Sequence, residues 1–279
     1  MRTDNIFDCS IQEVIDLMES IYDVDLSVFS ESFLEKSIIN RCIFVEVMRV
    51  SDYVIFLENN PTEAFALQQS LLITYTEFYR DACAFELFEE KILPELVRAK
   101  KTSAEIRIWS AGCSSGQEPY SIAMTTENYI ALNAKPMRYR IIATDISDEE
   151  LAFAKVGAFS EQSIQNIKLV QLNEFFEKSG NTYVISPRLK EKIIFSKYDI
   201  LDKHSASPKE SIFGEFDVVF CKNSLIYYND ECQKFIIDKL VNALSANGYL
   251  IIGESERHLL ISKSELQEVA VIPMFYKKK

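Results

Sequence analysis

A short apolar strand, a turn of small residues and the start of a helix follow one another in Ile106–Met124 (IRIWSAGCSSGQEPYSIAM). Small residues let a backbone approach a ligand closely, and a helix N-terminus offers unpaired N–H groups. In open α/β sheets, ligands lie at the carboxyl ends of the strands, where this turn is expected. An ordinary strand–helix turn would explain the glycines alone, but Glu118 adds a carboxylate that suits a cationic or hydroxyl-rich ligand and repels a pyrophosphate.

Two common ligand-binding turns do not fit this segment. A dinucleotide-binding fold requires G-x-G-x-x-G, whereas Ala111–Gly116 contains only two glycines. The phosphate-binding loop of nucleoside triphosphatases requires Gly-Lys-Ser/Thr, which this turn lacks. The segment therefore argues against both of these folds.

Two later segments also end strands with polar side chains. Ala143–Ser147 places Asp145 at the end of the next strand, where a carboxylate can accept hydrogen bonds from ribose hydroxyls. Asp145 could equally cap the following helix, although Ser147 or Asp148 could take that role instead. Phe216–Tyr228 is a buried strand followed by a polar turn and two tyrosines, which could stack on an adenine or simply pack in the core.

Short apolar strands alternate with helices after residue 100. The predicted strands are 106–110, 139–144, 192–196, 216–221 and 248–253, and the predicted helices are 118–130, 148–155 and 231–244. This alternation predicts a parallel sheet covered by helices on both faces. The rhythm breaks between about residues 159 and 190, where the strand-like run 181–186 predicts a small antiparallel insertion.

Residues 10–98 follow a helical pattern instead, with Val14, Met18 and Ile21 recurring at spacings of three and four. Asn60–Glu63 predicts a helix start with proline in the first turn, and a second start is expected near Thr76. We therefore predict a helical N-terminal domain of residues 1–98, followed by an α/β domain of residues 99–279.

Acidic residues are concentrated in the first third of the chain. Residues 1–95 hold 19 Asp+Glu and 6 Lys+Arg, a balance of −13, so the other 184 residues carry +1 of the total of −12. This distribution argues against nucleic-acid binding and against docking on an anionic membrane surface. No apolar run reaches the roughly 18 residues of a membrane helix, and no signal-peptide pattern is present, so we expect a cytosolic protein.

The six cysteines are scattered, and none forms a C-x-x-C pair. Only two histidines, His204 and His258, could join them as metal ligands. Zinc sites and disulfide frameworks need tighter clustering. We therefore expect no metal site, and reduced, mostly buried cysteines.

Taken together, these segments resemble the chemotaxis receptor methyltransferase (CheR) family over nearly the whole chain. The string WSAGCSSGQEPYSIA is highly specific, and the other matches keep the same order and spacing. The matching stretches are Tyr22–Ser27, Thr76–Asp81, Ile106–Met124, Ala143–Ser147, Phe216–Tyr228 and Gly253–Glu256. The resemblance implies methyl transfer from S-adenosylmethionine to glutamate side chains of chemoreceptors, which gives methyl esters and S-adenosylhomocysteine.

The fold that the resemblance implies is a doubly wound, Rossmann-like class I methyltransferase domain after a helical N-terminal domain. The insertion near residues 159–190 would be the family's small β-subdomain, which contacts receptors. The resemblance also implies the residues that bind the cofactor: Thr74, Thr76, Arg80, Glu118, Asp145, Asp199, Ile200, Cys221, Lys222 and Tyr227. Among these we expect Arg80 and Tyr227 to be catalytic, by positioning cofactor and acceptor carboxylate. An ion pair with Glu77 or Asp81 is the alternative role for Arg80.

The chain departs from the family pattern at four positions. Thr74 and Asp199 replace asparagines, Lys222 replaces an arginine, and Glu254 replaces a histidine. A lysine keeps the charge of arginine but not its planar fork. These departures leave two further hypotheses: a methyltransferase acting on another signalling protein, and a catalytically weak scaffold that binds cofactor or receptor.

The acidic N-terminal domain bears on the acceptor. Methylatable receptor helices are often acidic around their glutamates, so like charges would repel unless basic residues cluster. The candidates for such a cluster are Lys36, Arg41, Arg49 and Arg80.

Overall fold

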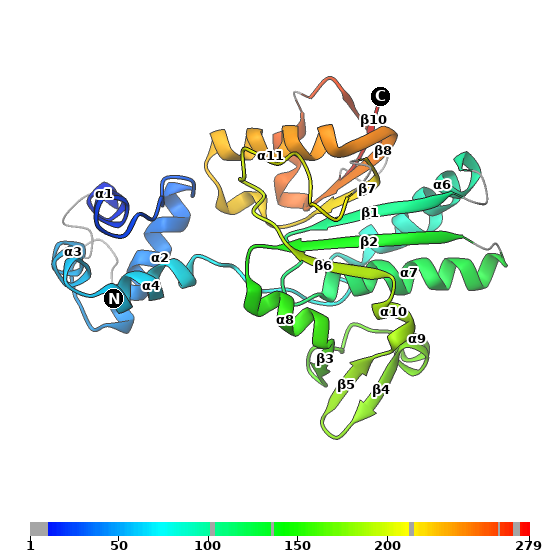
Figure 1. The fold of residues 1–279 in the computed structure, drawn as a ribbon, viewed down its shortest axis with the longest axis horizontal. Helices are drawn as coiled ribbons and strands as arrows, with labels where there is room; N and C mark the ends of the chain where they lie inside the picture. The colour runs from blue at the N-terminus through cyan, green and yellow to red at the C-terminus, as the bar shows by residue number, and fades with distance from the viewer. Residues whose placement is uncertain (1–10, 101–103, 135–136, 212–214, 262, 270–273) are drawn as a thin grey trace. The chain divides into compact units, whose positions relative to one another are not determined.

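The computed structural model describes residues 11–100, 104–134, 137–211, 215–261, 263–269 and 274–279 (Figure 1). The chain forms two compact units, one of residues up to Ile73 with Leu225–Lys234, the other of Thr74–Ser224 with Phe235–Lys279. This division differs from the boundary near residue 98 that the sequence predicts. The reason is that the helices between residues 82 and 99 contribute buried side chains, such as that of Phe88, to the core of the second unit.

Four helices make up most of the first unit: α1 (Ile11–Tyr22), α2 (Glu31–Phe44), α3 (Val50–Glu58) and α4 (Pro61–Ser70). Their apolar faces form one core, which includes the fully buried Val14, Met18 and Leu67. The helix start predicted at Asn60 is confirmed. The Asn60 side chain accepts a hydrogen bond from the backbone N–H of Glu63, and proline occupies the first turn.

A buried ion pair joins these helices. The guanidinium of Arg41 in α2 donates to both carboxylate oxygens of Glu63 in α4, at 2.8 and 2.5 Å. The hydroxyl of Tyr53 in α3 donates to the same carboxylate at 2.7 Å. The hydrogen bond from Arg41 to Glu63 is the main cause of the raised pKa of Arg41. Glu63 itself is only 5% exposed. Three helices therefore share one buried carboxylate.

Replacing Glu63 with alanine is expected to destabilise the first unit by about 3 kcal/mol, because it leaves a half-buried guanidinium without its partner. The single tryptophan, Trp109, is buried in the second unit, so its fluorescence follows that unit alone. In a urea titration, far-ultraviolet circular dichroism should show an early helical transition in the variant, while the Trp109 transition stays in place. Coincident shifts of both signals would contradict this expectation.

The segment Leu225–Lys234 follows a strand of the second unit in sequence but packs with the first unit. The backbone N–H of Ser30 donates to the carbonyl of Tyr227 at 2.9 Å, and that of Asn229 donates to the carbonyl of Val28 at 2.9 Å. The ring of Tyr227 lies 5.0 Å from that of Phe33. The backbone and the ring of Tyr227 are therefore both held by residues of the N-terminal region.

The second unit is built on a seven-stranded sheet of order β6-β2-β1-β7-β8-β10-β9. Its strands are β1 (Glu105–Ala111), β2 (Arg138–Asp145), β6 (Ile193–Lys197), β7 (Phe216–Cys221), β8 (Leu244–Ile252), β9 (Leu266–Glu268) and β10 (Phe275–Lys278). The first five pair in parallel, and β10 is antiparallel to both of its neighbours. In Figure 1, α11 lies on one face of this sheet and α7 and α8 lie on the other. The doubly wound α/β fold predicted from the sequence is confirmed.

The helices of this unit are mostly the connections between strands. They are α5 (Ala82–Leu87), the π-helical turn η2 (Phe88–Ile92), α6 (Leu93–Ala99), α7 (Gln117–Asn133), α8 (Asp148–Val156) and α11 (Asp230–Ala243), of which the residues up to Lys234 belong to the first unit. The helix start predicted near Thr76 is wrong, since α5 begins at Ala82. Tyr79 and Asp81 have φ angles of 54° and 61°, which a right-handed helix cannot contain.

A second, three-stranded sheet of order β3-β5-β4 follows α8. It consists of β3 (Ala158–Ser160), β4 (Phe176–Ser179) and β5 (Thr182–Ile185), with α9 (Leu169–Phe175) before β4 and α10 (Pro187–Lys190) after β5. All of its pairings are antiparallel. This is the small antiparallel insertion that the broken rhythm of residues 159–190 predicts.

The strand order reverses next to β1, because the chain moves from β1 outward to β2 and β6 and then returns to β7 on the other side. In doubly wound sheets the crevice at such a reversal, at the carboxyl ends of the strands, is where ligands bind. The loops after β1 and β7 therefore frame the candidate site. Within the described residues, no helix is long and apolar enough to cross a bilayer.

Candidate functional site

The turn after β1 is shaped by two glycines in the left-handed region, Gly112 (φ 75°) and Gly116 (φ 96°). The backbone N–H groups of Gly112 and Cys113 both donate to the carbonyl of Thr144 in β2, at 2.8 and 2.9 Å. A Cβ on Gly116 would lie 2.9 Å from the Cβ of Ala154 in α8. The turn therefore packs tightly against α8, and two of its backbone N–H groups are hydrogen-bonded at the carboxyl edge of the sheet.

Replacing Gly116 with alanine is expected to lower the free energy of unfolding of the second unit by about 2–4 kcal/mol, the sum of left-handed strain and overpacking against Ala154. Gly180 in the β4–β5 turn is a matched control, because it also has a positive φ (61°) but meets nothing within 4 Å. Its alanine variant should lose only about 1–2 kcal/mol. Urea unfolding followed by Trp109 fluorescence measures both, and equal losses would exclude the clash.

Glu118, in the first turn of α7, lies half-buried at this edge and accepts a hydrogen bond from the Ser110 hydroxyl at 2.7 Å. Burial raises the pKa of Glu118, and the nearby Glu256 adds to the rise. The positive charges of Lys222 and Arg80 act in the opposite direction. A carboxylate in this environment is stabilised by an incoming cation or hydrogen-bond donor.

Asp145 ends β2 and fixes the turn after β1. Its Oδ2 accepts from the backbone N–H of Ser114 at 2.8 Å, and its Oδ1 accepts from that of Ser147 at 3.0 Å. The helix-capping alternative is excluded, because the Ser147 hydroxyl caps α8 by accepting from the N–H of Glu150 at 3.2 Å. Each carboxylate oxygen of Asp145 keeps a lone pair for a further donor.

The segment before α5 contributes Thr74, Thr76 and Arg80. The carbonyl of Thr74 accepts from the Ser114 hydroxyl at 2.8 Å, so the backbone of Thr74 reaches the turn although its side chain is exposed. Thr76 is half-buried. The guanidinium of Arg80 lies over the Tyr75 ring, 5.4 Å from its centroid, and donates to the Tyr75 carbonyl at 3.4 Å. The alternative role of Arg80, an ion pair with Glu77 or Asp81, is not seen among the described residues: Asp81 pairs with Lys222, and Glu77 accepts from the Tyr75 hydroxyl.

The end of β6 brings Asp199 and Ile200 to the same edge. The backbone N–H of Tyr198 donates to the carbonyl of Asp145 at 3.0 Å. The Asp199 carboxylate is exposed and accepts from the N–H of Leu201 at 2.8 Å, while Ile200 is half-buried. Asp199 therefore stabilises its own turn and still faces solvent.

Two buried cysteines lie at this edge, Cys113 after β1 and Cys221 at the end of β7. Burial raises the pKa of both thiols far above the ordinary value, and neighbouring carboxylates add to the rise. Both thiols are therefore neutral near pH 7, which excludes a thiolate nucleophile. Three of the described cysteines, Cys42 among them, are buried, whereas Cys83 is exposed and Cys232 is half-buried. Cys9 lies outside the described residues.

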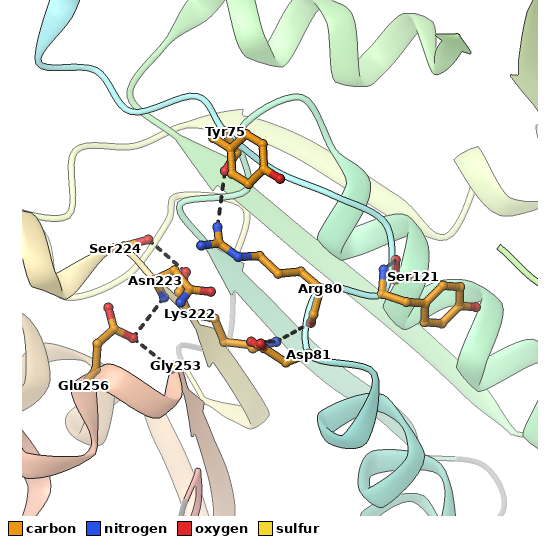
Figure 2. A network of polar contacts seen from close by, with 10 residues as sticks. Tyr75, Arg80, Asp81, Ser121, Lys222, Asn223, Ser224, Gly253 and Glu256 are labelled. Carbon is orange, nitrogen blue, oxygen red and sulfur yellow. Dashed lines mark hydrogen bonds and ion pairs between the residues drawn. The ribbon is translucent and has the colours of Figure 1, made fainter. Parts of the chain in front are cut away.

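The structure thus places nine of the expected cofactor residues in the second unit and Tyr227 in the first. Sequence reasoning missed three residues that organise the edge: Ser114, Asn223 and Glu256. Glu256 is fully buried, and its Oε2 accepts from the N–H groups of Asn223 at 2.9 Å and Gly253 at 2.8 Å (Figure 2). It thereby joins the loops after β7 and β8. The only sequence signal for Ser114, Asn223 and Glu256 was that each lies inside a stretch that matches the family.

The polar side chains at this edge fit S-adenosylmethionine, which carries cationic groups and hydroxyl donors. The half-buried carboxylates of Glu118 and Asp145 match these groups in charge and in hydrogen-bonding sense. The Oδ1 atom of Asn223 is buried and has no hydrogen-bond partner among the residues that the structure describes. Buried carbonyl oxygens are normally paired, so a ligand donor at this edge would complete the site.

Comparison with known proteins agrees with this geometry. Residues 74–271 match the model of the CheR methyltransferase, SAM binding domain. The chemotaxis protein methyltransferase of Borreliella burgdorferi is 29% identical over 257 residues, covering 90% of this chain and 89% of that protein. The chemotaxis protein methyltransferase of Escherichia coli K12 is 32% identical, covering 73% and 68%, and chemotaxis protein methyltransferase 1 of Pseudomonas aeruginosa is 33% identical, covering 65% of each. The chain therefore belongs to the CheR methyltransferase family, and its cofactor is S-adenosylmethionine.

Proposed function

We propose that this methyltransferase transfers the methyl group of S-adenosylmethionine to glutamate side-chain carboxylates of chemoreceptor cytoplasmic domains. The observation that carries the proposal is the carboxylate-lined edge formed by Glu118 and Asp145, in a chain whose relatives are chemotaxis protein methyltransferases. A cytoplasmic location is part of the same proposal. The product on the acceptor is a glutamate methyl ester.

When bound, S-adenosylmethionine supplies a methyl group on a cationic sulfur, whose carbon–sulfur bond breaks as the carboxylate oxygen bonds to the methyl carbon and the sulfur keeps the electron pair. A glutamate carboxylate is already ionised near pH 7, since its reference pKa is about 4.3. The acceptor therefore needs no general base. Alignment of the two reactants remains as the main task of the protein, and it can lower a barrier by roughly 7–11 kcal/mol in favourable cases.

The residues divide this task in the proposal. Glu118 and Asp145 hold the cationic and ribose parts of the cofactor, and the backbone of Thr74 supports the turn between them. Thr76, Asp199, Ile200 and Cys221 line the remaining edge. Arg80 positions the cofactor and the acceptor carboxylate, for which the planar fork of arginine is suited. The family resemblance gives Tyr227 the same role.

Transfer of a radiolabelled methyl group to purified receptor cytoplasmic domains tests the proposal. The label should appear on the receptor and be released by base, because carboxylate methyl esters are base-labile. A receptor with its candidate glutamates replaced by alanine is the matched control and should stay unlabelled. Absence of base-labile label on every receptor tested would refute the assignment of the acceptor.

One observation favours a second acceptor class. In the acidic first unit, Arg41 is paired with Glu63 and Arg49 with Asp52, so neither offers an uncompensated charge to an acidic receptor helix. A less acidic signalling protein would meet less repulsion there. Label on such a protein but not on receptors would favour this alternative, whereas calorimetry showing no S-adenosylhomocysteine binding would favour a scaffold.

A further inference from the structure

The backbone on either side of Arg80 adopts a conformation that residues with a side chain rarely take. The φ angles of Tyr79 (54°) and Asp81 (61°) both lie in the left-handed region. A bulky residue such as tyrosine is a genuine outlier there. Such strained turns persist only where surrounding contacts hold them, and they cluster at functional sites.

Two side chains hold this turn from outside (Figure 2). The hydroxyl of Ser121 in α7 accepts from the backbone N–H of Tyr79 at 3.0 Å. The Lys222 ammonium donates to the carbonyl oxygen of Arg80 at 2.8 Å and pairs with the Asp81 carboxylate at 3.0 Å. Asp81 directly precedes α5, yet its side chain does not cap that helix. The Asp81 carboxylate is therefore directed to Lys222.

Lys222 is well placed to act as an anchor. It directly follows β7, which pairs in parallel with both β1 and β8 in the middle of the sheet. Its side chain is only 2% exposed, and its ammonium lies 5.2 Å from the centroid of the Phe85 ring. A buried ammonium requires close partners. The two groups that its ammonium contacts, the Arg80 carbonyl and the Asp81 carboxylate, both belong to the strained turn, while its charge also acts on the nearby Glu118.

We infer that Lys222 is a positioning residue, whose ammonium holds the Tyr79–Asp81 turn so that the guanidinium of Arg80 is presented to the reacting groups. In this assignment the Lys222 side chain acts through Arg80 rather than by binding the cofactor. The inference rests on the proposed function, since it assigns Lys222 a part in the same reaction. The inference also explains why a lysine can take the place of the family's arginine here, because a single ammonium can bind one carbonyl and one carboxylate.

A double-mutant cycle between Lys222→Met and Arg80→Ala tests the inference, read as the single-turnover rate of methyl transfer to a receptor domain. Lys222→Met should lower the rate by about 10- to 100-fold, because a misplacement of about 1 Å in a positioned group can cost about 100-fold. In the Arg80→Ala background the same change should alter the rate by less than about twofold, which is the usual scatter of such additivity measurements. Non-additivity is expected because Lys222 acts through Arg80.

The matched control is Lys239→Met, another buried lysine, whose ammonium donates to the carbonyl of Asp202. Its effect should be the same in both backgrounds. Equal losses from Lys222→Met in both backgrounds, or no loss in either, would overturn the inference. Should Lys222→Met not fold, Asp81→Asn takes its place in the cycle.

The affinity for S-adenosylhomocysteine, measured by calorimetry on the same four proteins, separates this inference from the proposed function. A wild-type protein that labels no receptor would refute the acceptor assignment alone. The double-mutant cycle in the affinity for S-adenosylhomocysteine would then test the role of Lys222 by itself. Non-additive effects of the two substitutions would support the positioning role, and additive effects would contradict it.

Discussion

Arg80→Ala should lower the rate of methyl transfer roughly 100- to 1,000-fold, the range seen when one positioned donor is removed from an active site. The fold should survive, because within the part of the chain that the structure describes the Arg80 side chain makes only a long hydrogen bond to the Tyr75 carbonyl and a contact with an exposed ring. Such contacts contribute about 1 kcal/mol or less to stability. A large kinetic effect with a small stability effect is the mark of a catalytic side chain.

Single-turnover kinetics and thermal unfolding on the same variant measure the two effects. Arg80→Lys should fall between the wild type and Arg80→Ala, because an ammonium keeps the charge but not the two-pronged geometry. Arg49→Ala is the matched control: it removes an exposed arginine that pairs with Asp52 in the first unit. Wild-type turnover in Arg80→Ala would remove Arg80 from the mechanism.

The framework of the second unit could be predicted from the sequence because its strands are apolar runs that end in polar turns. The strands around Ile108, Ile141 and Val219 are buried in the sheet where the pattern places them. Of the strands of three or four residues, only β5 was predicted; β3, β4, β9 and β10 were not, since so few residues carry too little periodicity. The helix start near Thr76 was mispredicted because long-range contacts hold Tyr79 and Asp81 in left-handed conformations.

The site was predictable to the level of which segments meet, but not of what each side chain does. Local patterns placed Glu118 and Asp145 at the carboxyl edge, where the structure has them. The partners of Lys222 are 141 and 142 residues away in sequence, so spacing alone gave no sign of them. Glu256 was missed because its role is to join two loop backbones, which leaves no local pattern.

Glu118→Gln is expected to weaken the binding of S-adenosylhomocysteine roughly 10- to 100-fold, because a charged acceptor is replaced by a neutral amide of the same shape. The same change should stabilise the ligand-free protein near pH 7. The folded-state pKa of Glu118 is raised above its ordinary value of 4.5, so the folded chain binds this proton more tightly than the unfolded chain does. The stabilisation that protonation of Glu118 contributes is complete below the pKa of Glu118 in the unfolded chain, and it is lost as pH rises through the pKa of Glu118 in the folded chain.

The two consequences have opposite signs, and this makes the pair diagnostic. Calorimetry with S-adenosylhomocysteine should show the loss of affinity, while the melting temperature of the ligand-free variant should exceed that of the wild type near pH 7 and converge with it at about pH 4. Glu149→Gln, on the exposed surface of α8, is the control and should change neither quantity. A variant that lost stability and affinity together would instead make Glu118 a structural residue. Reduced affinity with increased stability means that Glu118 is kept charged for the ligand, at the expense of the fold.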